Sequence, residues 1–399
     1  MKILQLCNKP PYPSVDGGTM AMNSITQGLL AMECELKVLT VETDKHPVLE
    51  EKVSDEYRRR TGFESVYVDL RIKALPAMVA MLCGESYHVK RFESVAFAEK
   101  LKEILKQDSF DIVHVESLFL TPYVSLIRKY APSAKVIFRA HNVEHLIWKQ
   151  VAQSTRYGLK RWYLKHLSLA LRSYELEHVN DYDGVVCITA NDADYFRKAG
   201  CRRPITHIPF GIEPEDVGHV DVEPCSLFHI GAMDWMPNKE SIAWLLEEVW
   251  PVVHREVPQA HLYLAGRKMP MQWMKTDVEG VTVVGEVPDA MYFIASKQIN
   301  VVPLLSGSGI RVKIIEAMSM GKVVVTTTVG AQGIDYTDGE NLLIANTPAE
   351  FATQIKRCVE DADFCRQVGE AAAKLIHEHY DVQKLTERLM TFYNQILKR

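Results

Sequence analysis

The chain has 399 residues, more than one ordinary hydrophobic core accommodates, and this length predicts two domains of roughly 200 residues each. Hydrophobic residues make up 47% of the chain and charged residues 24%, which is typical of a globular protein and excludes a disordered or fibrous one. The net charge of −5 indicates no general affinity for nucleic acid, and we expect no such partner.

Short apolar runs alternate with longer amphipathic stretches along the whole chain, which is the pattern of parallel sheets covered by helices. The predicted strands of the first half cover residues 2–7, 36–41, 111–115, 135–140, 184–189 and 205–209. Those of the second half cover residues 226–231, 261–266, 281–285, 299–304, 322–327 and 341–345. After residue 349 the pattern is helical to the end. We therefore predict an α/β fold with two facing Rossmann-like, doubly wound parallel-sheet domains.

The boundary between the domains is predicted in residues 210–225, which carry prolines, glycines and acids without periodicity. The first domain then covers residues 1–212, the second residues 225–380, and a final helix residues 381–399. Ligands of doubly wound sheets bind at the carboxyl ends of the strands, so the segments that follow strands are the candidate binding segments.

Residues 306–327, "SGSGIRVKIIEAMSMGKVVVTT", place a glycine-rich turn and a helix between two predicted strands. The free N–H groups of Ser308, Gly309 and Ile310, with the helix dipole, predict an anion site. Arg311 and Lys313 carry the wrong charge for the start of a helix unless an anion binds there. A surface ion pair between Lys313 and Glu316 is the alternative interpretation. Glu316 can also accept hydrogen bonds from sugar hydroxyls, so the segment indicates a nucleotide site.

The first domain has two candidate segments. Gly17 and Gly18 follow the first strand and open a helix, so their amides are expected to face the same crevice. The segment "RAHNVEH", residues 139–145, matches the zinc-peptidase pattern H-x-x-E-H. Asn142 resembles a helix N-cap, which would leave His141 outside the helix and spoil the ligand geometry. His141 would then either meet a substrate hydroxyl or carbonyl, or be bonded within its own domain.

Three further segments of the second domain follow strands. Residues 231–241 contain Gly231 and an apparent N-cap at Asn238, residues 265–268 contain Arg267, and residues 285–289 follow another strand. Each alone is more often a plain connection, but their common placement favours one site.

The early Gly-Gly turn, "RAHNVEH", "HIGAMDWMPNKESIAWL", "LYLAGR" and above all "GSGIRVKIIEAMSMGKVVVTTTVGAQGI" resemble the GT-B-fold retaining glycosyltransferases of family four, the glycosyl transferases group 1. The resemblance implies transfer of a hexose-type sugar from a UDP- or GDP-linked donor to an acceptor hydroxyl, in cell-surface glycan or glycolipid synthesis. It implies retention at the anomeric carbon and no metal or other cofactor. The first domain would lie on the acceptor side, the second would bind the donor, and the final helix would cross back onto the first domain.

The same resemblance assigns residues to roles. Glu316 would contact the ribose, His141 the donor sugar, and Val287 would lie near the base. The donor phosphates would lie beside Gly17 and Gly18, and the sugar beside the backbone of Gly307, Ser308, Gly309 and Ile310.

The chain also departs from the family pattern. Ser308 stands where the family has the first glutamate of its E-x7-E motif, and Ala232 and Asn238 stand where it has two phosphate-binding cations. We expect Arg311 and Lys313, together with Arg267, to neutralise the diphosphate instead.

Residues 155–175 carry five Arg or Lys residues, one Glu and an apolar stripe. This helix either packs on its own domain or lies on an anionic membrane with a lipid-linked acceptor nearby. No run is long enough for a membrane span or a signal peptide, and the eight cysteines include no CxxC pair. We therefore expect a cytoplasmic protein, with peripheral contact at the inner face of the membrane if this helix binds lipid.

Three alternative functions stay open at this point. A nucleotide-sugar epimerase would use the same crevice, and a non-catalytic sugar-nucleotide binding protein would fit the replaced motif glutamate. A zinc peptidase would use the H-x-x-E-H segment.

Overall fold

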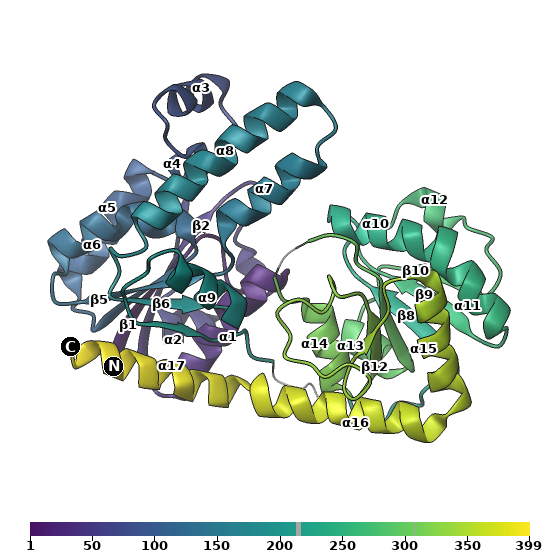
Figure 1. Cartoon of the computed structure of the whole chain (residues 1–399). Helices are drawn as coiled ribbons and strands as arrows, with labels where there is room; N and C mark the ends of the chain where they lie inside the picture. The colour runs from purple at the N-terminus through teal and green to yellow at the C-terminus, as the bar shows by residue number, and fades with distance from the viewer. Residues whose placement is uncertain (213–216, 308) are drawn as a thin grey trace. The chain divides into compact units, whose positions relative to one another are not determined.

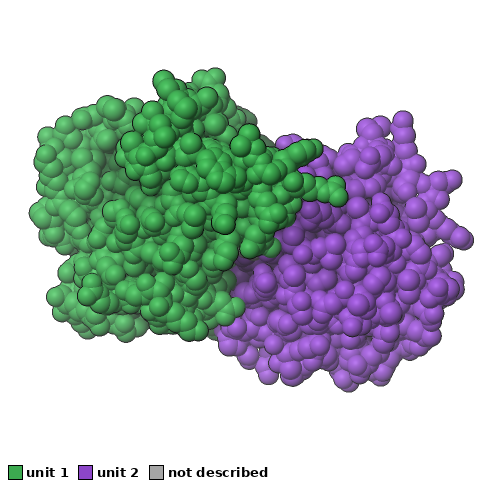
Figure 2. Space-filling view, turned by 45° about the horizontal axis from the view of Figure 1, so that its top comes forward, with its two compact units in different colours: residues 1–211, 382–399 green, residues 212–381 purple. Residues whose placement is uncertain are grey.

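The computed structural model describes residues 1–212, 217–307 and 309–399. The chain folds into two compact units, which Figure 2 shows in different colours. Residues 1–211 and 382–399 form unit 1, and residues 212–381 form unit 2. The order of the elements along the chain can be followed in Figure 1.

Unit 1 is built on a seven-stranded sheet whose paired strands are all parallel, in the order β3-β2-β1-β4-β5-β6-β7. Its strands are β1 (Lys2–Cys7), β2 (Glu35–Glu42), β3 (Glu64–Tyr67), β4 (Ile112–Glu116), β5 (Lys135–Ala140), β6 (Gly184–Cys187) and β7 (Ile205–His207). Its helices are α1 (Gly17–Ala31), α2 (Asp55–Thr61), α3 (Ala74–Leu82), α4 (Tyr87–Lys90), α5 (Val95–Gln107), α6 (Val124–Tyr130), α7 (Glu144–Ser154), α8 (Gly158–Glu177), α9 (Ala190–Lys198) and α17 (Val382–Leu397), with short 3₁₀ turns η1 (Glu50–Lys52) and η2 (Leu118–Tyr123).

Unit 2 is built on a six-stranded sheet, again with parallel pairs, in the order β10-β9-β8-β11-β12-β13. Its strands are β8 (Ser226–Ile230), β9 (His261–Ala265), β10 (Val281–Gly285), β11 (Ile299–Val302), β12 (Val323–Thr326) and β13 (Leu343–Ile344). Its helices are α10 (Met236–Trp244), the π-helical turn η3 (Leu245–Val249), α11 (Trp250–Glu256), α12 (Met271–Met274), α13 (Ala290–Ala295), α14 (Val312–Ser319), α15 (Pro348–Glu360) and α16 (Ala362–His379). In each sheet the strand order reverses beside the first strand, which is the doubly wound arrangement. The predicted fold class is confirmed.

The central strands are largely apolar and are buried along their whole length, because helices cover both faces of each sheet. Strands β4, β11 and β12 are buried at every position. This continuous burial explains why short apolar runs locate the strands so well. One strand was missed: β3 has four residues that are half-buried or exposed, and therefore no apolar run marks it.

Helix α17 belongs to unit 1, although the whole of unit 2 lies between it and the rest of unit 1 in the chain. Its Leu385, Leu389 and Phe392 join the core that lies between the sheet and α1. A Cβ on Gly28 of α1 would lie 1.9 Å from Thr386 Oγ1, so the two helices approach closely only because this residue is glycine. Within the described residues, no helix is both long and apolar enough to cross a bilayer.

Three helix starts differ from the sequence-based prediction. Helix α14 begins at Val312 with Arg311 as its N-cap, two residues later than expected. Helix α7 is capped at Val143 rather than Asn142, and α10 at Trp235 rather than Asn238. The Glu175 carboxylate of α8 accepts hydrogen bonds from the first two amides of α7. A residue distant in sequence therefore satisfies the helix start, where Asn142 was expected to accept these bonds.

Candidate functional site

In unit 2, the glycine-rich turn before α14 holds a buried arginine. Gly307 and Gly309 both have left-handed φ angles, of 118° and 78°. A Cβ on Gly307 would lie 3.0 Å from Arg311 Nη2 and 3.2 Å from the Trp235 ring, so a side chain there would press on both. The Arg311 guanidinium lies over the Trp235 ring, 5.5 Å from its centre. Burial lowers the pKa of Arg311 to about 10.

Lys313 is held by two polar groups of other elements. Its Nζ donates to Asn238 Oδ1 of α10 at 2.7 Å and lies 3.1 Å from His229 Nε2 of β8. His229 Nδ1 faces the Val301 carbonyl oxygen at 2.8 Å and donates to it, so Nε2 is left to accept from Lys313. Burial, and the charge of Arg311, lower the pKa of Lys313 to about 7. The nearby Glu316 carboxylate works in the opposite direction.

The strand ends around Lys313 are packed so closely that they require glycine. A Cβ on Gly231, directly after β8, would lie 2.9 Å from Lys313 Nζ and 2.7 Å from Asn238 Nδ2. Gly266, directly after β9, has a φ of 148°, and a Cβ there would lie 1.7 Å from the carbonyl oxygen of Gly231. The loops after β8, β9 and β11 therefore converge at one edge of the sheet, as the strand order β9-β8-β11 requires.

The other predicted residues of unit 2 lie at the same edge or just beyond it. Arg267 is exposed in the loop after β9, and its carbonyl oxygen accepts from Met233 N at 2.9 Å, which ties this loop to the one after β8. Val287 follows the edge strand β10 and is half-buried. Ile310 precedes Arg311 and is half-buried, and Ser308 lies outside the described residues. The structure thus brings Arg311, Lys313 and Glu316 together, and the loop that carries Arg267 follows a strand of the same sheet.

In unit 1, His141 directly follows β5, with 12% of its side chain exposed. Its Nε2 lies 2.7 Å from Glu116 Oε2, at the end of the neighbouring strand β4. Burial lowers the pKa of His141, and the Glu116 carboxylate works against that shift. A neutral His141 therefore donates its Nε2 proton to Glu116 and leaves Nδ1 as an acceptor.

Glu116 is the centre of a buried polar network that the sequence analysis missed. It is fully buried, accepts from Gln5 Nε2 at 3.0 Å, and lies 3.3 Å from Arg139 Nη1. Burial alone would raise the pKa of Glu116, but Arg139 and His114 outweigh it and hold the pKa well below its usual range. His114 in turn bonds the hydroxyl of Tyr393 on α17. The available signal was a charged residue inside an apolar strand, at Glu116 and at Arg139.

Gly17 and Gly18 open α1 as predicted, and a cation lies beside them. Asp16 caps the helix by accepting from Thr19 N at 2.9 Å, and Lys9 Nζ donates to the same carboxylate at 2.6 Å. A Cβ on Gly18 would lie 2.9 Å from Lys9 Nζ, so the glycine leaves room for the ammonium group.

The H-x-x-E-H segment does not form a metal site. His141 precedes α7 and bonds Glu116, whereas His145 lies within α7, where Nδ1 bonds Glu175 Oε2 at 2.5 Å and Nε2 lies 2.8 Å from Tyr195 OH. No group of three or more His, Cys, Asp or Glu side chains in the described part of the chain is placed to hold a metal ion. Both histidines thus have partners in unit 1, and the ligand geometry of a zinc peptidase is absent from these residues.

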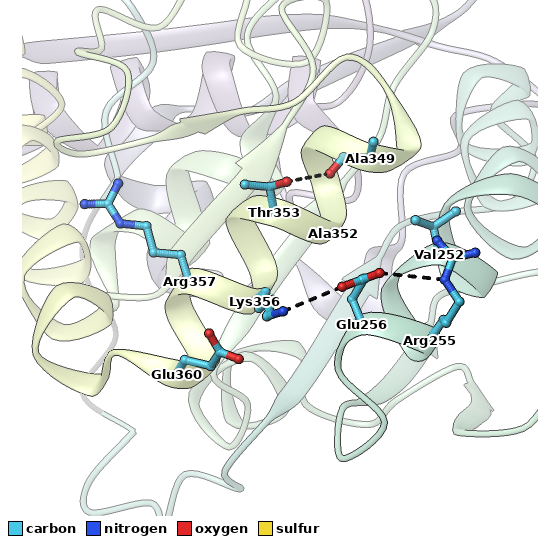
Figure 3. A pocket seen from close by; sticks show the side chains of 9 residues that line it. All are labelled: Val252, Arg255, Glu256, Ala349, Ala352, Thr353, Lys356, Arg357 and Glu360. Carbon is cyan, nitrogen blue, oxygen red and sulfur yellow. Dashed lines mark hydrogen bonds and ion pairs between the residues drawn. The ribbon is translucent and has the colours of Figure 1, made fainter.

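A separate pocket of about 450 Å³ lies between α11 and α15 of unit 2 (Figure 3). Its Lys356 is paired with Glu256 at 3.6 Å, and Arg255 lies 3.7 Å from the same carboxylate. Residues 255 and 256 precede β9, so the pocket lies toward the amino end of the sheet and not among the loops described above. It adds nothing to the candidate site.

Comparison with known proteins follows the division seen in the structure. The model of the family described as Glycosyltransferase Family 4 matches residues 15–216, just over half of the chain. The chain belongs to glycosyltransferase family 4. A second model, described as Glycosyl transferases group 1, matches residues 224–361 of this glycosyltransferase. The resemblance stated from the sequence motifs is thereby confirmed.

The glycosyltransferase also has similar proteins along its whole length. A curated relative, "Uncharacterized 44.6 kDa protein in cps region" of Klebsiella pneumoniae, is 24% identical over 96% of this chain and 97% of its own. The sucrose-phosphate synthase of Thermosynechococcus elongatus has a similar structure, with a TM-score of 0.72 at 15% identity and full coverage of both chains. Anabaena HepE, solved in complex with UDP and glucose, has a TM-score of 0.65 at 12% identity, covering 97% of this chain and 98% of its own. These structural likenesses show that the fold is GT-B.

Proposed function

We propose that this glycosyltransferase moves a hexose-type sugar from a nucleotide-sugar donor to an acceptor hydroxyl in polysaccharide or glycolipid synthesis. Unit 2 binds the donor, unit 1 contributes His141 and the acceptor side, and the nucleotide is UDP or GDP. The solved complex of HepE with UDP and glucose supports a nucleotide-sugar donor, and the relative in the cps region supports a role in polysaccharide synthesis.

The observation that carries the proposal is the cluster of Arg311 and Lys313 at the sheet edge. Two cations, Arg311 and Lys313, meet at the carboxyl edge of the unit 2 sheet, where three glycine-lined loops converge. Lys313 Nζ lies against Asn238, the position at which the family pattern would place a cation of its own. Burial disfavours the charged form of Lys313 and lowers its pKa to about 7. A bound diphosphate would stabilise that charged form, so an anion at this position is favoured.

In the proposed reaction, the bond between the anomeric carbon and the donor phosphate oxygen breaks while the acceptor oxygen bonds the same face of that carbon. The acceptor proton passes to an oxygen of the leaving phosphate, so charge and atoms balance without a protein nucleophile. Arg311 and Lys313 stabilise the negative charge that develops on the leaving diphosphate. Glu316 accepts from the ribose hydroxyls, and the backbone of Gly307, Gly309 and Ile310 faces the sugar. No metal is required in this scheme.

His141 is assigned to the sugar because its Nδ1 can accept from a hydroxyl group. Glu116 fixes the tautomer by accepting the Nε2 proton. In the same unit, Gly17 and Gly18 lie at the start of α1, and the free amides of a helix start suit a phosphate oxygen.

The first test is titration with UDP and GDP, each in the presence of a chelator. We expect one nucleoside diphosphate to stabilise the protein by roughly 2.7 kcal/mol at about 100 times its Kd. The variant with Arg311→Met and Lys313→Met should lose this stabilisation. Lys356→Met, in the separate pocket of Figure 3, serves as the matched control and should keep it.

Product analysis then separates the proposed transfer from the two alternatives on the same fold. A transferase releases free nucleoside diphosphate together with a glycosylated acceptor, whereas an epimerase interconverts nucleotide sugars without releasing it. A non-catalytic protein binds the donor and leaves it unchanged. Stabilisation that is undiminished in the double variant would contradict the assignment of Arg311 and Lys313.

A further inference from the structure

Helix α3 exposes four large apolar side chains and buries two alanines. Ala77 and Ala80 pack against Leu164 and Leu167 of α8, in a small core that Tyr87 and Ala152 complete. The exposed large apolar residues of α3 are Leu75, Met78, Val79 and Leu82, at i, i+3, i+4 and i+7, which is one face of a helix. Leu75 is 66% exposed and Leu82 76%. A contiguous apolar face of this kind marks a binding surface rather than ordinary solvent contact.

The first half of α8, the helix on which α3 packs, also exposes large apolar side chains. Leu159 is 83% exposed and Trp162 57%, whereas Leu164, Leu167 and Leu171 further along the helix are buried. The predicted stripe is thus not uniform: Leu167 is packed on unit 1, whereas Leu159 and Trp162 are exposed. Helices α3 and α8 are in contact, and both lie at the top of the view in Figure 1.

The charge around this surface is positive. Residues 156–174 contain Arg156, Lys160, Arg161, Lys165 and Arg172 and no Asp or Glu, although the whole chain carries a net charge of −5. Among the described residues, no ion pair involves Lys160, Arg161 or Lys165. Exposed leucines with an interfacial tryptophan, flanked by unneutralised cations, are the features of a surface that lies on anionic lipid.

We propose that α3 and the first half of α8 form a docking surface for an anionic phospholipid bilayer. The apolar side chains enter the boundary between headgroups and acyl chains, and Lys160, Arg161 and Lys165 contact lipid phosphates. Helix α7 has eleven residues and links this surface to the His141 loop over about 16 Å. An acceptor anchored in the bilayer would therefore lie beside the same part of unit 1 that carries His141. The surface is independent of the donor site, so vesicle binding can fail while nucleotide binding stands.

The test is flotation of the full chain with vesicles of phosphatidylglycerol mixed equally with phosphatidylcholine, compared with vesicles of phosphatidylcholine alone. We expect binding to the anionic vesicles that weakens as salt is added. The charge reversal Lys160→Glu with Arg161→Glu should weaken binding by about 30-fold or more, since each basic residue near the surface contributes severalfold. The matched control is Arg59→Glu with Lys398→Glu, two exposed cations elsewhere in unit 1, which should change little.

The apolar contribution is tested separately. Leu75→Ser with Leu82→Ser should reduce binding at high salt as well as at low salt, because the lost term is hydrophobic. Val95→Ser removes a side chain that is 82% exposed on α5 and should leave binding unchanged. Circular dichroism melts show whether the variants keep the fold, which we expect because all the changed side chains are exposed.

Four outcomes would overturn the proposal. The first three are no flotation with anionic vesicles, equal binding to neutral vesicles, and charge-reversed protein that binds as tightly as the unmodified chain. The fourth outcome is a protein that does not bind vesicles but is a dimer in light scattering, and whose dimer is dissociated by Leu75→Ser with Leu82→Ser. The apolar face would then be an interface between copies of this chain.

Discussion

The lowered pKa of Lys313 leads to a quantitative prediction about nucleotide binding. Lys313 is half protonated near pH 7 in the free protein, because burial lowers its pKa to about 7. A bound diphosphate favours the charged form and raises that pKa, so binding takes up a proton whenever the free lysine is neutral. Affinity for UDP or GDP must then fall as the pH rises through the pKa of the free protein.

The magnitude follows from the protonated fraction. That fraction is about one half at pH 7 and about 1% at pH 9, so the affinity should fall by roughly 50-fold, equivalent to about 2.3 kcal/mol. The second ionisation of a terminal phosphate, near a pKa of about 6, is largely complete over this range and does not account for the loss. At pH 8 the binding should take up about 0.9 proton per nucleotide.

Isothermal titration calorimetry at pH 7, 8 and 9, in two buffers that differ in ionisation enthalpy, measures both quantities. Lys313→Met should bind weakly with an affinity that does not depend on pH, whereas Lys356→Met should reproduce the slope of the unmodified protein. Affinity that is constant from pH 7 to pH 9, or a slope that persists in Lys313→Met, would refute the reasoning.

Three further predictions concern the buried parts of both units. Glu116→Gln should lower the free energy of unfolding of unit 1 by about 3–5 kcal/mol in urea titrations, because Arg139 is left buried beside a neutral group. Adding Arg139→Met should recover much of that loss. A loss under about 1 kcal/mol in the single variant would contradict this account. Tyr393→Phe should cost about 1–3 kcal/mol by leaving His114 without its partner on α17, and an unchanged melting curve would show that this bond is unimportant. Gly266→Ala should impair folding of unit 2, because the new Cβ meets a carbonyl oxygen and the φ angle is left-handed. Gly339→Ala is the control, since its φ is also left-handed but nothing lies within 4 Å of the new Cβ. An equal effect of the two changes would show that the clash is not the cause.

Much of the candidate site could be predicted because its residues follow strands. Arg311 and Lys313 stand out in the sequence because cations oppose the dipole at the start of a helix, and the structure places both at the carboxyl edge of the sheet. The position of α14 was predicted less well: the helix starts at Val312 and not at Ile310, because the backbone of Arg311 is extended.

The sequence by itself determined the α/β class, nearly every strand and the family, because apolar runs, glycine turns and motif residues are local properties. Only the tertiary structure decided the partners of the key side chains. Lys313 meets His229 because β8 and β11 are neighbours in the sheet although residues 231–298 separate them, and Glu116 meets His141 because β4 and β5 pair in parallel register. In the same way, half of α8 is buried because α3 and α7 cover it, and half remains exposed. Strand order and helix coverage are set by long-range packing, and that packing brings distant residues to one edge or leaves a face open.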